Sequence, residues 1–162
     1  MDESINLINF TDLKLDEKKM ILSWRNHPNV KEWMYDSNDI PIENHLSFIE
    51  SLKDSKDKQY FIVKQDKEYI GVIDFTEINN PEIFFGLYSN PNAKIAGVGR
   101  ILEKVCINYA MNILNVDTLK LEVFSDNIQV RNLHKKFNFK ETGKKIINNK
   151  EVICMELKNE NR

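Results

Sequence analysis

The stretch YSNPNAKIAGVGR, residues 88–100, follows an apolar run at 83–88 and leads into a segment with helical spacing of apolar residues. Gly97 and Gly99 lack a Cβ atom, so the backbone there can approach a ligand closely. Because the first N–H groups of a helix are unpaired and its dipole is positive at this end, the turn favours a diphosphate. A purely structural turn is the alternative, since the three-glycine dinucleotide pattern and the phosphate loop ending in Gly-Lys-Ser/Thr are both missing.

The rest of the chain alternates between strand-like and helix-like patterns. We predict strands at 5–10, 60–63, 69–78, 83–88, 118–124, 139–147 and 151–157, and helices at 16–24, near 30–34, from 41, from 97 and at 127–137. Ser125 or Asp126 is expected to cap the helix at 127–137. No repeat, low-complexity segment or evident linker interrupts the chain, so residues 1–162 are predicted to form a single α+β domain.

The composition is that of an ordinary globular protein. Of the 162 residues, 41% are hydrophobic and 30% are charged, and no apolar run approaches the roughly 18 residues that span a membrane. The N-terminus has no basic segment followed by an apolar run, so a secretory signal is not expected. Cys106 and Cys154 have no metal-like spacing, and no cluster of His, Cys, Asp and Glu indicates a metal site. We predict a reduced, cytoplasmic protein without a metal and without membrane association.

Charge is distributed unevenly along the chain. Residues 1–93 contain 10 Lys and Arg against 17 Asp and Glu, whereas residues 94–162 contain 13 against 8. Nucleic-acid binding is not expected, because no basic stripe is interleaved with stacking aromatic residues. A basic C-terminal half suits a polyanionic small ligand, and a random scatter of surface Lys is the alternative.

Two motifs resemble those of the GNAT acetyltransferases. In that family the pyrophosphate loop has Gln or Arg, two residues, Gly, one residue, and Gly or Ala; KIAGVG at 94–99 fits with Lys in the basic position. A second landmark is an Asn that opens the next helix, followed by a Leu-Tyr-x-Lys-x-Gly-Phe run. Asn127 and LHKKFNF at 133–139 are similar to it, with His in place of the Tyr. The resemblance covers about residues 5–157.

The resemblance implies the GNAT fold, a central mixed, mostly antiparallel sheet flanked by helices, and acetyl-CoA as the acetyl donor. In this fold a bulge splays two central strands apart, and the acyl arm lies between them. The Tyr88 N–H is then expected to face the thioester oxygen and stabilise the developing charge. Asn127 bonds the arm from the opposite strand or simply caps its helix. The implied coenzyme-binding residues are Leu87, Tyr88, Ser89, Lys94, Ile95, Ala96, Gly97, Val98, Gly99, Arg100, Asn127, Arg131 and Leu133; Arg100, Arg131 and Lys135 are candidates for the 3′-phosphate.

Acetyl transfer to an amine requires a proton acceptor and a proton donor. Glu122 is the candidate general base, directly or through water, with a solvated surface position as the alternative. Asp74 is expected to hold the amine or a relay water, or else to form a surface pair. His134 is predicted to replace the family's tyrosine as proton donor to the coenzyme thiolate; the alternative is a partly solvated helix residue.

A closer resemblance is to the acetyltransferases of bacterial pseudaminic acid synthesis, which serves flagellin glycosylation. It is carried by WRNHP at 24–28, WMY at 33–35, HL-x-F at 45–48, GVID at 71–74 and LEV at 121–123. It implies transfer to the 4-amino group of UDP-4-amino-4,6-dideoxy-N-acetyl-β-L-altrosamine. Arg25 and His45 would meet phosphate oxygens, and Trp33, Met34 and Tyr35 would enclose the deoxysugar methyl group.

Two other functions remain open at this point. The Arg-Asn-x-Pro start is shared with ribosomal-protein N-terminal acetyltransferases, which need a groove that admits an extended peptide. The missing tyrosine permits a domain that binds acetyl-CoA without turnover, although the intact glycine loop and Glu122 speak against it. The sequence leaves a homodimer open as well.

Overall fold

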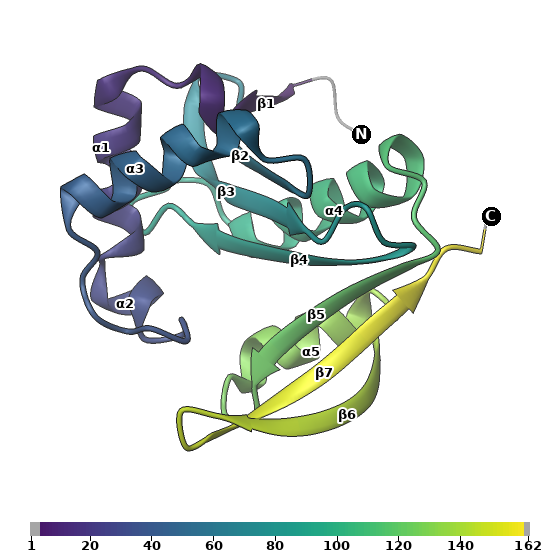
Figure 1. Ribbon diagram of the computed structural model, residues 1–162. Helices are drawn as coiled ribbons and strands as arrows, with labels where there is room; N and C mark the ends of the chain where they lie inside the picture. The colour runs from purple at the N-terminus through teal and green to yellow at the C-terminus, as the bar shows by residue number, and fades with distance from the viewer. Residues whose placement is uncertain (1–3, 161–162) are drawn as a thin grey trace.

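The computed structural model describes residues 4–160, which contain one seven-stranded sheet in the order β1-β2-β3-β4-β5-β7-β6 (Figure 1). Neighbouring strands are antiparallel except β4 and β5, which are parallel. The expected mixed, mostly antiparallel sheet is therefore confirmed. The strands are β1 Ile5–Asn9, β2 Lys58–Gln65, β3 Glu68–Thr76, β4 Glu82–Ser89, β5 Thr118–Phe124, β6 Lys140–Ile147 and β7 Lys150–Lys158.

Helices cover both faces of the sheet (Figure 1). On one face α1 and α3 enclose a core that includes Trp24, Ile49 and Val72. On the other face α4 and α5 pack over Leu102, Leu119 and other buried side chains. No helix within residues 4–160 is long and apolar enough to cross a membrane. The helices are α1 Leu15–Arg25, α2 Pro28–Lys31, α3 Ile42–Ser51, α4 Val98–Asn108 and α5 Ile128–Lys136, with short turns at Phe10–Asp12, Leu52–Asp54 and Tyr109–Ile113.

Helix starts differ from the predictions in two places. The helix predicted near 30–34 begins earlier, at Pro28, because His27 Nδ1 accepts a hydrogen bond of 3.1 Å from the Asn29 N–H and Pro28 suits a first helical position. The predicted cap of α5 is wrong: Asn127, rather than Ser125 or Asp126, occupies the cap position. The Asn127 side chain makes no capping hydrogen bond, so its amide is not used by the helix.

The two halves of the sheet separate between β4 and β5. These strands pair only where Glu82–Phe84 faces Thr118–Lys120, although β4 continues to Ser89 and β5 to Phe124. The β3–β4 register is continuous, so the expected bulge at this point is absent from the described strands. Instead β4 stays bonded to β3 and β5 to β7 along its whole length, so each half follows its own partner (Figure 1). The separation leaves a gap in the middle of the sheet.

Candidate active site

A cleft of about 860 Å³ lies where β4 and β5 separate. It brings together most of the residues that the sequence predicts for the site. They are Arg25, Met34, Tyr35, His45, Asp74, Leu87, Tyr88, Ser89, Gly99, Glu122, Asn127, Leu133 and His134. A second hollow of about 720 Å³ lies at the paired ends of β4 and β5 and contains none of the predicted site residues.

The turn before α4 has the geometry that the two glycines suggest. Gly97 occupies the cap position with a φ of 71°, a left-handed conformation that favours glycine. A Cβ atom at Gly97 would meet nothing within 4 Å, so the requirement there is conformational. Gly99 lies on the first turn of α4 and lines the cleft. The start of α4 therefore offers accessible backbone beside the gap.

The other predicted coenzyme residues fall into two groups. Lys94, Ala96, Gly97 and Arg100 are exposed around the turn, whereas Ile95 packs against the core and Val98 is buried in it. Arg131 is already engaged, because its guanidinium donates to the Ser125 carbonyl at 2.7 Å and pairs with Glu141 at 2.9 Å. Arg131 would therefore have to give up one of these contacts to meet the 3′-phosphate for which the sequence made it a candidate.

Asp74 lies on the α1–α3 face of the gap. Its side chain is on the same face of β3 as Val72, which belongs to the core beneath α1 and α3. The carboxylate makes no side-chain hydrogen bond with any residue in the described part of the chain, and burial raises the pKa of Asp74 to about 7. The surface pair considered from the sequence is thus excluded.

Gly86 explains why the Asp74 carboxylate has room. The two residues are cross-strand partners in β3 and β4. A Cβ atom at position 86 would lie 2.8 Å from Asp74 Oδ2, closer than any normal contact. A residue other than glycine would therefore displace the carboxylate from the cleft wall.

Glu122 reaches the same face from β5 but is held by two neighbours. It alternates with Leu121 and Val123, which belong to the core beneath α4 and α5, so its side chain points to the opposite face. Tyr35 Oη donates to Glu122 Oε1 at 2.5 Å, and the Lys145 ammonium pairs with Oε2. Burial and the Glu122 carboxylate raise the pKa of the Tyr35 phenol, which therefore stays protonated at neutral pH.

His134 lies on the opposite, α4–α5 side of the gap. It is buried with an exposed fraction of 5%, so the alternative of a partly solvated helix residue is wrong. Its Nδ1 lies 2.5 Å from Oε1 of Glu103, a residue of α4 with no exposed surface. The rings of Phe85 and Phe139 pack edge-on against the imidazole. One ring nitrogen is thus fixed by a carboxylate in otherwise apolar surroundings.

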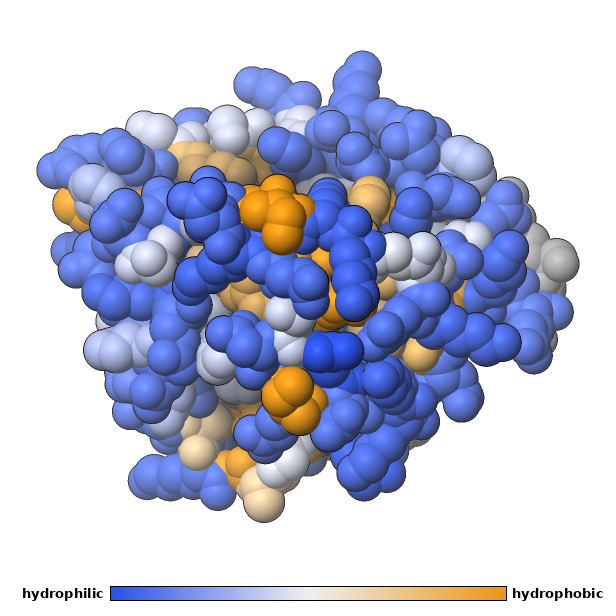
Figure 2. Space-filling view, turned by 90° about the horizontal axis from the view of Figure 1, so that it is seen from below, coloured by the Kyte–Doolittle hydropathy of each residue, from blue (hydrophilic) through white to orange (hydrophobic). Residues whose placement is uncertain are grey.

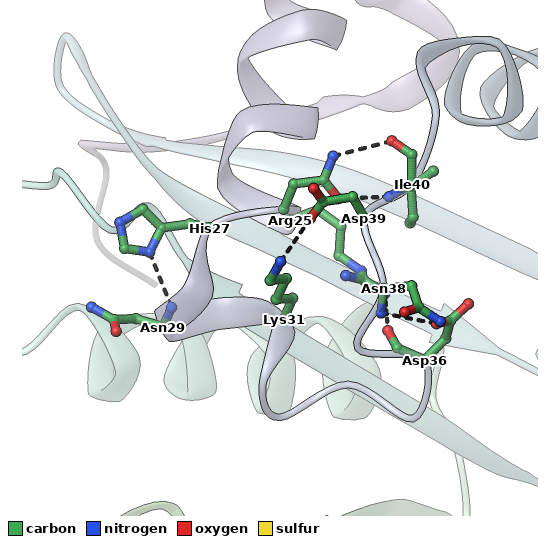
Figure 3. A network of polar contacts seen from close by, with 9 residues as sticks. Arg25, His27, Asn29, Lys31, Asp36, Asn38, Asp39 and Ile40 are labelled. Atoms are coloured by element: carbon green, nitrogen blue, oxygen red, sulfur yellow. Dashed lines mark hydrogen bonds and ion pairs between the residues drawn. The ribbon is translucent and has the colours of Figure 1, made fainter.

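The loop after α1 forms the entrance of the cleft, and its polar contacts hold it in shape (Figure 3). Arg25 donates to the Asp36 carbonyl at 2.7 Å, and Lys31 pairs with Asp39 at 2.8 Å. The buried Nη1 of Arg25 has no hydrogen-bond partner among residues 4–160. Trp33 and Tyr35 are exposed at this entrance, with exposed fractions of 39% and 42%.

His45 lines the cleft but does not present a donor to it. Its Nε2 donates to the Lys18 carbonyl at 2.8 Å, and burial lowers the pKa of the imidazole, so the ring is neutral. A neutral ring with Nε2–H committed to a carbonyl has no N–H left for a phosphate. This geometry corrects the predicted phosphate contact of His45.

Sequence reasoning missed three residues of the site. Glu103 follows Gly99 by four positions and therefore shares its helical face, a signal that could have been used. Gly86 and Lys145 reach Asp74 and Glu122 through strand pairing and a long side chain. Such long-range contacts leave no local pattern in the sequence.

The comparisons with known proteins agree with this architecture. Residues 19–139 match the model of the acetyltransferase (GNAT) family. The chain therefore belongs to the GNAT acetyltransferases, and the predicted fold and enzyme class are confirmed.

The individual proteins that this chain resembles are also acetyltransferases. Acetyltransferase PseH of Campylobacter jejuni subsp. jejuni serotype O:23/36 (strain 81-176) is 44% identical over 135 residues, 83% of this chain and 84% of the relative. The crystal structure of Campylobacter jejuni N-acetyltransferase PseH in complex with acetyl coenzyme A has 36% identity and a TM-score of 0.77, covering 95% of this chain and 98% of that one. Spermidine N-acetyltransferase from Vibrio cholerae, in complex with CoA and spermine, reaches a TM-score of 0.85 at 20% identity, with 98% and 97% of the two chains covered. The last similarity shows a shared fold alone.

Proposed function

We propose that this acetyltransferase binds acetyl-CoA across the gap between β4 and β5 and transfers the acetyl group to a primary amine. The observation that carries the proposal is the cleft itself, which opens beside the glycine turn of α4. Its α1–α3 side holds two carboxylates, and its α4–α5 side holds an imidazole. A thioester lying in the gap would have a proton acceptor on one side and a proton donor on the other. The complex of the PseH relative with acetyl coenzyme A supports the choice of this coenzyme.

On the amine side, Asp74 is the better proton acceptor. An ammonium must lose a proton before its nitrogen can attack the thioester carbonyl. Asp74 is unpaired and its pKa of about 7 matches neutral conditions, whereas Glu122 is held by Tyr35 and Lys145. We therefore assign the base to Asp74 and the orientation of the amine to Glu122, although the sequence favoured Glu122 as the base.

On the thiol side, the tetrahedral intermediate collapses with loss of the coenzyme thiolate. The β3–β4 register directs the Tyr88 N–H toward Val72, because the Asn90 N–H donates to the Ile70 carbonyl and this pattern repeats at every second residue of the pair. We therefore propose that the N–H groups of Leu87 and Ser89, which face the gap, hold the pantetheine arm and stabilise the oxyanion, in place of the Tyr88 N–H expected from the sequence. Asn127 can bond the arm from α5, since its amide is not used as a cap. His134 is proposed to protonate the thiolate, in the place where the family has a tyrosine.

The proposed acceptor is the 4-amino group of UDP-4-amino-4,6-dideoxy-N-acetyl-β-L-altrosamine, in pseudaminic acid synthesis. The 44% identity with Acetyltransferase PseH supports this choice. The unpaired Nη1 of Arg25 suits a phosphate oxygen of the nucleotide, and Met34 and Trp33 offer apolar surface for the deoxysugar methyl group. The coenzyme and the sugar nucleotide would then enter from different sides of the sheet.

Thiol release from acetyl-CoA in the presence of a panel of UDP-4-amino-sugars tests the proposal. We expect turnover with the altrosamine derivative and little with its 4-hydroxy analogue, which lacks the nucleophile. Peptides that begin like ribosomal proteins form the second arm, and turnover with peptides alone would replace the sugar with a protein N-terminus. Coenzyme binding by calorimetry without turnover on any amine would instead indicate a sensor.

A further inference from the structure

The predicted proton donor, His134, is hydrogen-bonded to the buried carboxylate of Glu103. Glu103 has no exposed surface, and Oε1 accepts the 2.5 Å hydrogen bond from His134 Nδ1. Its other oxygen, Oε2, is buried and has no partner among residues 4–160. No Lys or Arg forms an ion pair with Glu103 in that part of the chain. The side chain thus has one polar contact, and that contact is the imidazole.

Burial of a carboxylate in this position is costly for folding. A buried charge with incomplete hydrogen bonding destabilises a protein strongly unless a partner compensates it. An apolar residue at position 103 would continue the buried face that includes Val98, Leu102 and Cys106. The carboxylate therefore has a local cost that a purely structural role does not explain.

We propose that Glu103 is a positioning residue that fixes the His134 ring with Nε2 toward the gap and stabilises the imidazolium form that protonates the leaving thiolate. The inference rests on the proposed acetyl transfer and adds to it a residue that acts through His134. Within residues 4–160 no hydrogen bond occupies Nε2, and His134 lines the cleft, so this nitrogen can meet the coenzyme sulfur. A neutral imidazole with its proton on Nδ1 has no proton at Nε2 to give, so the acid must be the imidazolium.

The step balances in atoms and charge. The C–S bond breaks, its electron pair goes to sulfur, and the Nε2 proton of the imidazolium passes to that sulfur. The ring is left neutral, with its Nδ1–H still donated to Glu103. Solvent restores the Nε2 proton after the coenzyme leaves. The nitrogen loses two protons between ammonium and amide, one to Asp74 before attack and one from the tetrahedral adduct, and both pass to solvent from the carboxylate side of the gap, so each turnover releases one proton net.

The charges around His134 make Glu103 the group to test. From α4, Glu103 is the charged residue in contact, and Cys106 is neutral because burial, Asp74 and Glu103 raise the pKa of its thiol. Phe85 and Phe139 contribute only apolar rings. On α5 itself, Lys135 and Lys136 are exposed and Lys135 pairs with Glu141.

The test uses the purified full chain with Glu103→Gln, which keeps an acceptor for Nδ1–H and removes the charge. We expect kcat to fall about 10- to 100-fold, as is typical when a supporting carboxylate of a functional histidine is lost. The KM and Kd for acetyl-CoA should stay within about twofold, and the alkaline limb of the kcat profile should move to lower pH. Cys106→Ala, a change on the same buried face of α4, is the control and should leave kcat and its pH profile unchanged. An E103Q enzyme with the parent's kcat and alkaline limb would overturn the proposal.

The same Glu103 substitution in a His134→Tyr enzyme distinguishes a positioning role of Glu103 from a packing role. In His134→Tyr the phenol can donate a proton without a carboxylate, so adding E103Q should change kcat less than about twofold. An equal loss in both backgrounds would show that Glu103 supports the fold rather than the imidazole, and would overturn the proposal. Imidazole ¹⁵N–¹H spectra give a readout independent of turnover: the His134 signals should change at lower pH in E103Q than in the parent chain. Unchanged signals would refute the proposed effect of Glu103 on His134 even if acetyl transfer itself is observed. An absence of thiol release from the parent chain would refute only the proposed function.

Discussion

Asp74 and Glu103 are acidic residues on opposite sides of the gap, and their carboxylates have opposite surroundings. On the α1–α3 side the Asp74 carboxylate has no hydrogen-bond partner among the described residues, and Gly86 leaves space around it. On the α4–α5 side the Glu103 carboxylate is closed in and bonded to His134. An unpaired buried carboxylate gains a proton readily, whereas a carboxylate beside an imidazole favours protonation of the ring. This difference fits the proposed mechanism, in which the amine gives its proton to the Asp74 side of the gap and the thiolate receives one from His134.

Removal of the unpaired carboxylate should have the largest effect. Asp74→Asn keeps the shape and removes the proton acceptor, so kcat/KM should fall about 10²- to 10⁴-fold. Glu122→Gln is the matched control and should lose about tenfold or less. Initial rates with the amine acceptor at pH 6–9 measure both. A larger loss in E122Q than in D74N would return the role of base to Glu122.

The same comparison predicts how activity depends on pH. A base must be unprotonated in the free enzyme, and the pKa of Asp74 is raised to about 7. The parent kcat/KM should therefore rise with pH and level off above about pH 7, and that rise should be absent from the residual activity of D74N. An unchanged acidic limb in D74N would assign it to another group.

The space beside Asp74 can be closed from the neighbouring strand. Gly86→Ala places a Cβ atom 2.8 Å from Asp74 Oδ2, so the carboxylate must move. We expect kcat/KM to fall about 10- to 100-fold, in keeping with the sensitivity of catalysis to displacement of a reacting group. Gly143→Ala is the control, since a Cβ atom there meets nothing within 4 Å. Equal activities of G86A and G143A would show that catalysis does not depend on the position of the Asp74 carboxylate.

An unpaired carboxylate should also reduce stability. Because the folded-state pKa of Asp74 is about 7 against a usual 3.8, the native state binds the extra proton, and stability is lost as pH rises between these values. Asp74→Asn should therefore raise the free energy of unfolding by about 1–2 kcal/mol at pH 8, after allowance for water in the cleft, and change it little at pH 4. Urea denaturation of both proteins at the two pH values measures the difference. A destabilised D74N at pH 8 would show that the carboxylate has a stabilising partner in solution.

The sequence predicted the strands and helices around the gap better than it predicted the contacts of Asp74 and Glu103. The strands, the glycine turn and the separation of β4 from β5 follow from local patterns and from the resemblance, and the structure bears them out. Asp74 was identified because it interrupts an apolar strand. Its freedom was not, because it depends on Gly86 across the β3–β4 pair. Glu103 was missed for a related reason: the helical pattern shows its position but not the imidazole that α5 brings to it.

The smallest predicted effect concerns the hydrogen bond from Tyr35 to Glu122, a contact that Asp74 lacks. Tyr35→Phe removes the 2.5 Å hydrogen bond to Glu122 and leaves the loop attached through Asn148, whose Nδ2 donates to the Tyr35 carbonyl at 2.9 Å. If Glu122 only orients the amine, the KM for the amine should rise about three- to tenfold with kcat nearly unchanged, within the range of a typical net hydrogen bond, because the exposed Tyr35 bond is weakened by solvent. The pKa of Tyr35 is raised, so this effect should be the same from pH 6 to 9. Tyr69→Phe, which loses a 2.7 Å bond to Glu17 away from the cleft, is the control and should leave KM unchanged. A large fall in kcat in Y35F alone would mean that the phenol takes part in the proton transfer, and that the two sides of the gap are less distinct than their contacts indicate.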